Sequence, residues 1–171
     1  MSETSLEELK KGLDIGIVNI VVSTSLGHDI PLEKMAATLS NTEYNPEQFP
    51  GLVIRIKEPK TSALIFSSGN VVCTGAKSLE EVRQSLERIK ETLTKINIKI
   101  TITPEINIQN MVASGSIGMD LNLNTLAMKL DNTEYEPEQF PGLVFKLNEA
   151  KATFLLFSNG KIVCTGTKSE E

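Results

Sequence analysis

The feature that most constrains the fold of this 171-residue chain is an internal repeat with a fixed offset of 91 residues. The phrase NTEYNPEQFPGLV begins at position 41, and NTEYEPEQFPGLV begins at position 132. The alignment continues without a gap to residue 169, and upstream the run NIVVS at position 19 falls on NMVAS at position 110. A unit of this length is too long for a solenoid repeat. Two lobes related by a pseudo-twofold axis are therefore expected.

The bulk composition indicates an intracellular globular protein. There is no apolar run of about 18 residues, and the N-terminus lacks the apolar core of a signal peptide. We expect a cytoplasmic protein in which Cys73 and Cys164 are free thiols, because that compartment disfavours disulfides. The single histidine, His28, argues against most metal sites and against histidine-based catalysis. We therefore expect no metal and no cofactor.

Periodicity predicts the same order of elements in both units. Residues 19–26 and 109–117 are β-branched or small polar runs, which favour strands. A short helical pattern follows each of them, and then three short strands in which the last two are joined by a turn. The expected helical positions are Leu32, Met35, Ala36 and Leu39 in the first unit and Leu123, Leu126, Ala127 and Leu130 in the second.

A long amphipathic helix closes the first unit. Ser78 and Glu81 have the spacing of a capping box, and an apolar stripe runs from Leu79 to Leu93. The second unit reaches the matching cap, KSEE, at Glu171, so the residues of its expected last helix are absent: either the sequence is shortened or the natural chain lacks that helix. An uncovered apolar strip behind its strands would favour self-association or a low melting temperature. The N-terminal stretch SLEELKKGL is amphipathic and is a candidate to fill part of this gap.

Strand alternation predicts one mixed face and one apolar face in each unit. The apolar side chains, such as Ile20 and Cys73, alternate with a set of amides, hydroxyls and valines. If helices cover the apolar face, the mixed face must meet solvent or a partner. The mixed positions are Asn19, Val21, Val72 and Thr74 in the first unit and Asn110, Val112, Val163 and Thr165 in the second.

Four of the six phenylalanines form two pairs with equal internal spacing, Phe49 with Phe66 and Phe140 with Phe157. The first member of each pair lies in the repeated proline-rich phrase, and the second ends a strand before a turn. Two interpretations remain open at this point. The rings are either exposed wedges at two symmetric edges of a binding surface or anchors of the core.

Charge is distributed unevenly, although the net charge is −5. Residues 52–77 and residues 143–168 each carry four basic side chains against one acidic side chain. Local fields act over a Debye length of about 8–10 Å, so basic strands on an acidic protein can still bind phosphate. The alternative is that these are ordinary solvated lysines.

The chain resembles the TATA-box-binding proteins of the archaeal type over about residues 13–171. The resemblance rests on EYNPEQFPGLV with EYEPEQFPGLV, on IFSSGNVVCTGAKS with LFSNGKIVCTGTKS, and on NIVVS with IQNMVAS. It implies an α+β saddle: two tandem repeats with pseudo-twofold symmetry form one curved antiparallel ten-stranded sheet, with helices on its convex face. The implied organisation is an N-terminal extension (residues 1–12), a first repeat (13–96) and a second repeat that is truncated before its last helix (97–171).

The resemblance implies binding in the minor groove of A·T-rich promoter DNA, the TATA box, with kinking of the duplex. Proteins of this family are a standard example of that mode of binding. The eight mixed-face residues would contact the groove floor, and the four paired phenylalanines would open base steps. The positions that match phosphate contacts are Arg55, Lys60, Lys146, Lys151 and Lys161.

The resemblance also implies protein partners. The proline-rich loop of the second repeat would dock transcription factor B through Glu136, Glu138 and Gln139, and RNA polymerase would be recruited indirectly. The alternative for these residues is a solvated loop. A general initiation factor at the nucleoid is thus the first hypothesis for function. The second is a DNA-independent regulatory duplicate that sequesters transcription factor B, and an enzyme on a related half-saddle fold is disfavoured because the sequence shows no carboxylate cluster.

Overall fold

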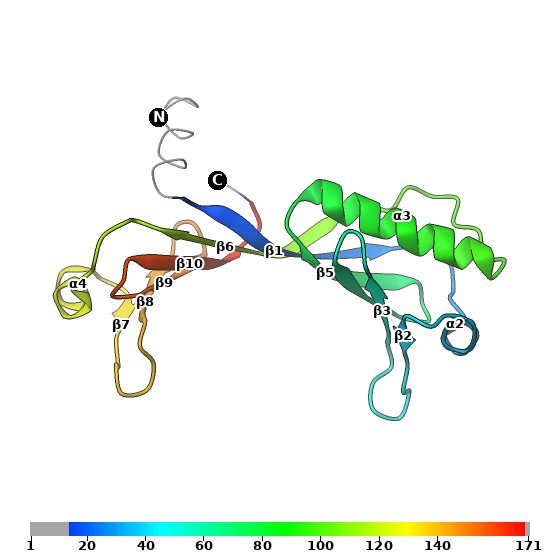
Figure 1. Cartoon of the computed structure of the whole chain (residues 1–171), viewed down its shortest axis with the longest axis horizontal. Helices are drawn as coiled ribbons and strands as arrows, with labels where there is room; N and C mark the ends of the chain where they lie inside the picture. Colours follow the sequence, from blue (N-terminus) through cyan, green and yellow to red (C-terminus); the bar gives the residue numbers. More distant parts are fainter. Residues whose placement is uncertain (1–13, 170–171) are drawn as a thin grey trace. The chain divides into compact units, whose positions relative to one another are not determined.

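The computed structural model describes residues 14–169. Ten strands and three helices lie in this part of the chain (Figure 1). The elements are β1 (Gly16–Ser25), α2 (Leu32–Thr38), β2 (Thr42–Glu43), β3 (Leu52–Ile56), β4 (Thr61–Ile65), β5 (Asn70–Ala76), α3 (Leu79–Lys95), β6 (Asn107–Ser116), α4 (Leu123–Lys129), β7 (Thr133–Glu134), β8 (Leu143–Leu147), β9 (Ala152–Leu156) and β10 (Lys161–Thr167).

The ten strands belong to one antiparallel sheet. One half has the order β2-β3-β4-β5-β1, and the other has the matching order β7-β8-β9-β10-β6. The described chain divides into two compact lobes. The first lobe is residues 19–109, and the second lobe is residues 14–18 with 110–169. The α+β fold class and the ten-stranded antiparallel sheet expected from the sequence are confirmed.

In the first lobe, α3 covers the apolar face of the half-sheet. Ser78 caps this helix by accepting a hydrogen bond from the Glu81 backbone N–H at 3.1 Å, as the sequence predicts. The Glu81 carboxylate accepts from the N–H of Lys77, one residue before the cap. The apolar stripe of α3 is buried against the strands, and the three strands β3, β4 and β5 alternate between buried side chains and side chains that are half-buried or exposed. The covered face is therefore a complete core.

In the second lobe, no helix of the described residues lies over β8, β9 and β10 (Figure 1). The alternation between buried and exposed side chains is largely lost there, since most positions on these strands are half-buried. This is the uncovered apolar strip expected from the sequence. The stretch SLEELKKGL, proposed to fill part of it, lies outside the described residues.

Two short strands were not evident from the pattern of residues. The two-residue strands β2 and β7 lie at the start of the repeated phrase, where prolines and carboxylates disfavour long strands. Each pairs with the strand that follows the phrase, for example Thr42 with Ile54 and Glu43 with Val53. A two-residue strand needs only one neighbouring strand, and β3 and β8 provide it.

No helix of residues 14–169 is long and apolar enough to cross a membrane.

Candidate nucleic-acid interface

In the first lobe we call the face opposite α3 the front face, and in the second lobe the front face is the one that corresponds to it at an offset of 91 residues. The eight mixed positions expected from the sequence lie on these front faces, and all of them are half-buried rather than enclosed in a core. Their neighbours along each strand, such as Ile20 and Val71, are fully buried on the opposite face of the first lobe. The front-face residues are Asn19, Val21, Val72 and Thr74 in the first lobe and Asn110, Val112, Val163 and Thr165 in the second.

The two asparagines are held in one orientation by the same contact in both lobes. The Gly75 N–H donates to Asn19 Oδ1 at 2.7 Å, and the Gly166 N–H donates to Asn110 Oδ1 at 2.9 Å. A backbone N–H can face only the oxygen of a side-chain amide, so this contact decides which way the amide points. The amide NH2 of Asn19 is left for the front face, and the NH2 of Asn110 keeps one donor besides its contact with Thr165.

Both glycines lie at an irregularity of the sheet that makes this contact possible. The pairing of β5 with β1 shifts between Ile20 and Val22, opposite Gly75, and the pairing of β10 with β6 shifts opposite Gly166. Both glycines have positive φ angles, +92° and +86°, which side chains of L-residues rarely adopt. A β-bulge of this kind redirects a backbone N–H away from the ladder, here toward the asparagine.

The threonines next to these glycines complete each cluster. Thr74 Oγ1 lies 3.4 Å from Asn19 Oδ1, and Asn110 Nδ2 donates to Thr165 Oγ1 at 3.3 Å. Each half-sheet thus presents an amide and a hydroxyl side by side, surrounded by valine methyl groups. Such a surface can donate hydrogen bonds to acceptors on a flat apolar ligand.

The paired phenylalanines lie together in each lobe. The ring centroids of Phe49 and Phe66 are 5.9 Å apart at an interplanar angle of 63°, and those of Phe140 and Phe157 are 5.9 Å apart at 68°. Phe49 is 43% exposed and Phe140 is 40% exposed, while their partners are half-buried. The interpretation as core anchors is therefore wrong for Phe49 and Phe140.

The glycine of each FPG motif makes room for both rings of a pair. A Cβ atom on Gly51 would lie 2.7 Å from a ring carbon of Phe49 and 3.2 Å from one of Phe66. The corresponding distances for Gly142 are 2.7 Å to Phe140 and 3.1 Å to Phe157. All four distances are shorter than an ordinary van der Waals contact. Each ring pair therefore rests on a glycine backbone.

The repeated proline-rich phrase is a closed turn that carries the first ring of each pair. The Asn45 carbonyl accepts hydrogen bonds from the N–H groups of Gln48 and Phe49 at 3.1 and 3.0 Å. The Glu136 carbonyl accepts from Gln139 and Phe140 at 2.9 and 3.0 Å. This turn fixes the backbone from which the phenylalanine projects, which explains why the phrase is written twice with a ring at its end.

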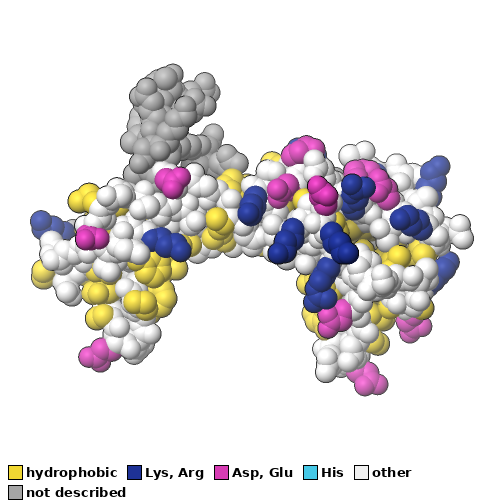
Figure 2. Space-filling model, viewed as in Figure 1, with side chains coloured by type: hydrophobic (Ala, Val, Ile, Leu, Met, Phe, Trp, Pro, Cys, Tyr) yellow, Lys and Arg dark blue, Asp and Glu magenta, His cyan; other side chains and the backbone are white. Residues whose placement is uncertain are grey.

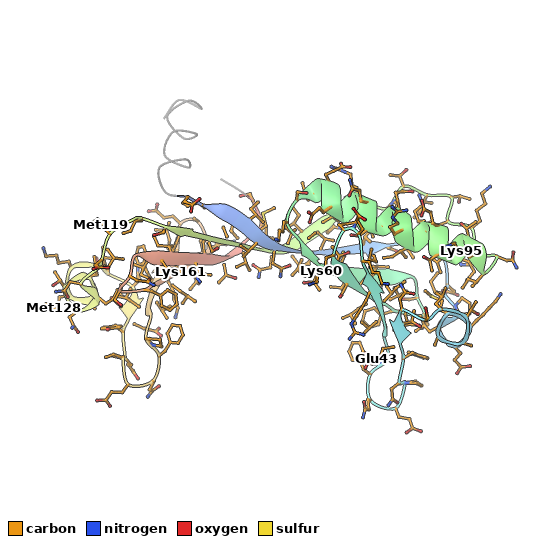
Figure 3. All side chains as sticks on the ribbon, in the orientation of Figure 1. Glu43, Lys60, Lys95, Met119, Met128 and Lys161 are labelled. Atoms are coloured by element: carbon orange, nitrogen blue, oxygen red, sulfur yellow. The ribbon has the colours of Figure 1, made fainter. Side chains whose placement is uncertain are left out.

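Basic side chains border the front faces. Arg55 is bound to Glu43 at 3.1 Å, and Lys146 is bound to Glu134 at 2.9 Å, and all four side chains are more than half exposed. Lys60, Lys151 and Lys161 are also exposed, and no residue among 14–169 forms an ion pair with them. Lys161 begins β10 and Lys60 precedes β4 (Figure 3). The two glutamates are counter-ions that the sequence analysis did not identify.

The loop of the second lobe carries Glu136, Glu138 and Gln139, all of them exposed. In Figure 2 this loop shows hydrophobic side chains next to the sheet and an acidic side chain toward its tip. An exposed, rigid and acidic loop beside an apolar surface is suited to contact with a protein partner.

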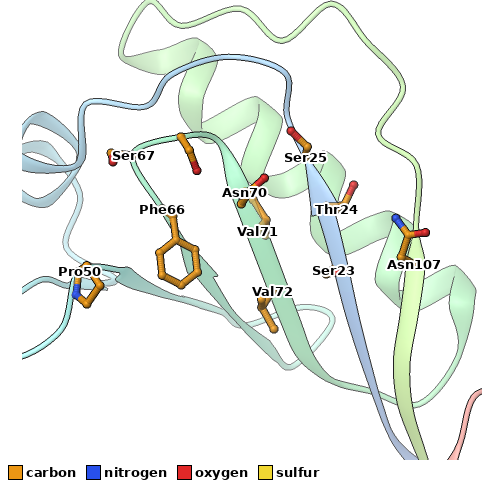
Figure 4. Close-up of a pocket in the computed structure, with 11 residues that line it drawn as sticks. Ser23, Thr24, Ser25, Pro50, Phe66, Ser67, Asn70, Val71, Val72 and Asn107 are labelled. Carbon is orange, nitrogen blue, oxygen red and sulfur yellow. The ribbon is translucent and has the colours of Figure 1, made fainter.

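The front face of the first lobe also has a shallow depression near Phe66 that the sequence analysis missed. Its wall combines small hydroxyl and amide side chains with one ring (Figure 4). The lining residues are Ser23, Thr24, Ser25, Pro50, Phe66, Ser67, Ser68, Asn70, Val71, Val72 and Asn107. The depression is continuous with the surface formed by Phe66 and Val72, so it belongs to the same candidate interface.

The described residues contain no group of three or more His, Cys, Asp and Glu side chains placed to hold a metal ion. Both cysteines are free, and burial raises the pKa of each thiol above its ordinary value. For Cys73, a hydrogen bond with Ser85 lowers the pKa in part. Neither thiol is thereby activated as a nucleophile at neutral pH.

The comparisons with known proteins agree on one family. A sequence model described as "Transcription factor TFIID (or TATA-binding protein, TBP)" matches residues 14–96 and 105–171. The TATA-box-binding protein of Methanothermobacter thermautotrophicus is 52% identical over 159 residues, which are 93% of this chain and 88% of that protein. That of Thermococcus kodakarensis is 51% identical over 155 residues, which are 91% and 82% of the two chains.

A solved structure shows the same likeness in three dimensions. The structure titled "Methanococcus jannaschii TBP" superposes with a TM-score of 0.85 at 52% sequence identity. The superposition covers 91% of this chain and 89% of that chain.

Proposed function

Because the chain belongs to the TATA-binding protein family, whose model matches residues 14–96 and 105–171, we propose that it is a transcription initiation factor. Its ligand is the minor groove of A·T-rich promoter DNA, and the front face of each half-sheet contributes contacts to the duplex. Residues 13–96 and 97–171 are the two repeats, preceded by an N-terminal extension of residues 1–12. It acts by binding and bending DNA, and its family is one of transcription factors rather than enzymes.

The observation that carries this proposal is the pair of oriented asparagine amides. In the minor groove an A·T pair offers only the acceptors N3 and O2, whereas a G·C pair adds the N2 amino donor of guanine. Asn19 and Asn110 have their oxygens bound to Gly75 and Gly166, so the groups that remain are donors. Donors directed at a surface of acceptors select A·T.

The valines and threonines support the same selectivity. Val21, Val72, Val112 and Val163 form the apolar part of the front faces around the amides. An additional amino group from guanine would have to be buried against these methyl groups without a hydrogen-bond partner, which costs about 1–3 kcal/mol. Thr74 and Thr165 supply further hydroxyl contacts to the same groove floor.

The two phenylalanine pairs kink the duplex. Each pair holds one exposed and one half-buried ring edge-on beside a glycine backbone, so the exposed ring can enter between two base pairs without first leaving a core. Unstacking a base step costs a few kcal/mol, and flexible TA steps reduce that cost. The protein would therefore select its DNA sequence partly through how easily each base step is deformed.

The basic residues on the front-face borders neutralise phosphates. Arg55 and Lys146 exchange their partners Glu43 and Glu134 for phosphate oxygens, and Lys60, Lys151 and Lys161 add contacts. Asn70 occupies the position that corresponds to Lys161, so the first lobe has one phosphate contact fewer. Affinity falls with salt in proportion to the number of phosphates bound.

Transcription factor B is the proposed protein partner, and it recruits RNA polymerase in turn. Glu136, Glu138 and Gln139 form its docking loop, supported by their exposure and by the closed turn beneath them. A double substitution, Glu136→Arg with Glu138→Arg, should abolish the ternary complex and leave DNA binding intact. The matched control is Asn45→Arg with Glu47→Arg, which makes the equivalent change in the first lobe. Equal loss with both variants, or none with either, would contradict the assignment.

The first test measures bending. Energy transfer between dyes at the two ends of a short TATA-containing duplex should rise on titration with the chain and should not rise with a scrambled duplex. The double variant Phe66→Ala with Phe157→Ala should lose the signal. Phe145→Ala is the matched control, because this ring lies in the second lobe on the opposite face of the sheet from Phe157.

The second test isolates the amide contact. Replacing A·T pairs by inosine·cytosine changes the major groove but leaves a minor groove without an amino donor, so binding should persist. Replacement by G·C restores that donor and should reduce affinity by at least about tenfold. A folded chain that neither binds nor bends any of these duplexes would favour the alternative function, a regulator that sequesters transcription factor B.

A further inference from the structure

The repeat allows the two lobes to be compared position by position, and one exposed position differs in chemical kind. At an offset of 91 residues Gln109 corresponds to Val18. Gln109 belongs to the first lobe and Val18 belongs to the second. Both side chains are exposed, Val18 to 43%. One lobe thus carries a polar amide where the other carries two methyl groups.

Gln109 lies on the front face of the first lobe. Its Nε2 donates a hydrogen bond to Ser23 Oγ at 2.8 Å. Ser23 lines the front-face depression, and so does Asn107, two residues before Gln109 on β6 (Figure 4). Residues two apart on a strand point to the same face. Since Asn110 also lies on a front face, the alternation of β6 is interrupted after Gln109. Gln109 therefore faces the same ligand as Asn19.

The bond to Ser23 gives Gln109 a polarity opposite to that of Asn19. Asn19 Oδ1 accepts from the Gly75 N–H, so Asn19 presents donors to the ligand. Gln109 uses one N–H on Ser23, and no group among residues 14–169 donates to its Oε1. With the amide turned over, the Ser23 hydroxyl would donate to Oε1 and would itself remain able to accept. The pair of Gln109 and Ser23 thus presents an acceptor in either orientation.

An acceptor on this face has one partner in the minor groove. The groove edge of an A·T pair carries acceptors only, whereas a G·C pair adds the N2 amino donor of guanine. Gln109 with Ser23 can accept from that amino group. The methyl groups of Val18 would leave it without a partner, which is unfavourable once water is excluded.

We propose that Gln109, together with Ser23, admits a G·C pair at one position of an otherwise A·T-selective site. Val18 disfavours G·C at the corresponding position that the second lobe contacts. Gln109 is then a specificity-determining residue that reads the minor groove in the opposite sense to the two asparagines. This inference rests on the proposed binding to the minor groove.

The test compares three duplexes of equal length: an A·T site, the same site with one G·C pair, and the same site with G·C at both of two symmetry-related positions. The replaced position is moved along the site in turn. A chain that can bind in either orientation can place Gln109 at a single G·C pair, but it cannot serve two. At one position the chain should bind the one-pair duplex within about threefold of the A·T site, and the two-pair duplex should bind about tenfold more weakly or worse.

Two variants exchange the residue between the lobes, and each result is expressed relative to the affinity of the same chain for the A·T duplex. Gln109→Val should extend the penalty of about tenfold to the one-pair duplex. Val18→Gln should relieve the penalty of the two-pair duplex, because Ser114 stands at the position that corresponds to Ser23. Inosine·cytosine in place of G·C should remove the penalties in every chain, because inosine lacks the amino group.

Two results would overturn the proposal. One is a scan in which every position shows the full penalty already with one G·C pair. The other is an equal one-pair penalty in the parent chain and in Gln109→Val. If Gln109→Val binds no duplex at all, Val18→Gln decides, and an unrelieved two-pair penalty then counts against the proposal. Failure of the parent chain to bind the A·T duplex would instead contradict the proposed function itself.

Discussion

The two half-sheets are built from nearly the same sequence, yet within residues 14–169 only one of them has its apolar face covered by a long helix. The first lobe places α3 over its strands, and its apolar alternate positions are fully buried. The second lobe has the same alternation, and most of the corresponding positions are half-buried. The difference shows that the strand pattern decides which way a side chain points, whereas a separate element decides whether that side chain leaves water.

The largest expected difference between the lobes concerns a matched pair of core positions. Ile65→Ala in the first lobe should lower the free energy of unfolding by about 2–5 kcal/mol, because Ile65 is 0% exposed and leaves a cavity. Leu156→Ala at the corresponding position should cost about 1 kcal/mol, because that side chain is already partly solvated. Urea denaturation of both variants measures the two values. Equal losses would break the comparison, and a larger loss at Leu156 would mean that another segment covers it.

A buried hydroxyl pair gives the next effect in size. Thr61 Oγ1 and Ser85 Oγ lie 2.7 Å apart between β4 and α3, and in the second lobe Ala152 replaces the threonine. Ser85→Ala should cost about 1–3 kcal/mol, since Thr61 keeps only its longer contact with the Pro59 carbonyl, at 3.4 Å. Thr61→Val with Ser85→Ala should recover part of this loss in a double-mutant cycle. Additive losses in that cycle would show that the pair does not couple the helix to the sheet.

The thiols provide a smaller, pH-dependent difference. Burial raises the pKa of Cys73 in the folded chain, so the unfolded chain loses its thiol proton first as pH rises. Stability is therefore complete below the ordinary thiol pKa of 9.0 and declines as pH rises through it. Thermal melts between about pH 8 and pH 10.5 should show this decline, and Cys73→Ala should flatten it. Cys164→Ala, at a half-buried site, should flatten it less, and the reverse order would contradict the burial difference.

The smallest effect tests whether the lobes also differ away from the face that α3 covers in the first lobe. Glu43→Gln and Glu134→Gln remove equivalent ion pairs with Arg55 and Lys146, all of them well exposed. Each change should alter the free energy of unfolding by about 1 kcal/mol or less, and by the same amount in both lobes. Chemical denaturation at low salt would reveal a difference. If one variant were clearly more destabilised, the asymmetry between the lobes would extend beyond the face that α3 covers in the first lobe.

Much of the architecture could be predicted because the sequence contains the same unit twice. The offset of 91 residues, the strand alternation and the Ser78 capping box indicated the two lobes, the free faces and α3. The positions of the front-face residues follow from period-two alternation alone, without reference to any partner. Their roles in binding DNA remain predictions that rest on family resemblance and on chemistry.

Other features depend on contacts that no linear pattern reveals. The bond from Gly75 to Asn19 joins residues 56 positions apart, and it exists only because of a bulge in the ladder. The pairing of Arg55 with Glu43 depends on the short strand β2, which propensity disfavours. The one signal that could have pointed to the glycines was their identity in both copies of VCTG.

The glycine beneath each ring pair has a consequence for how this surface can vary. Gly51 touches both Phe49 and Phe66, so any side chain there would displace two rings with one substitution. A substitution at one glycine would thus displace both rings of its pair, and the duplicated chain has two such glycines, Gly51 and Gly142. Mutational tolerance around the ring pairs should accordingly be low at two residues that contribute no functional group at all.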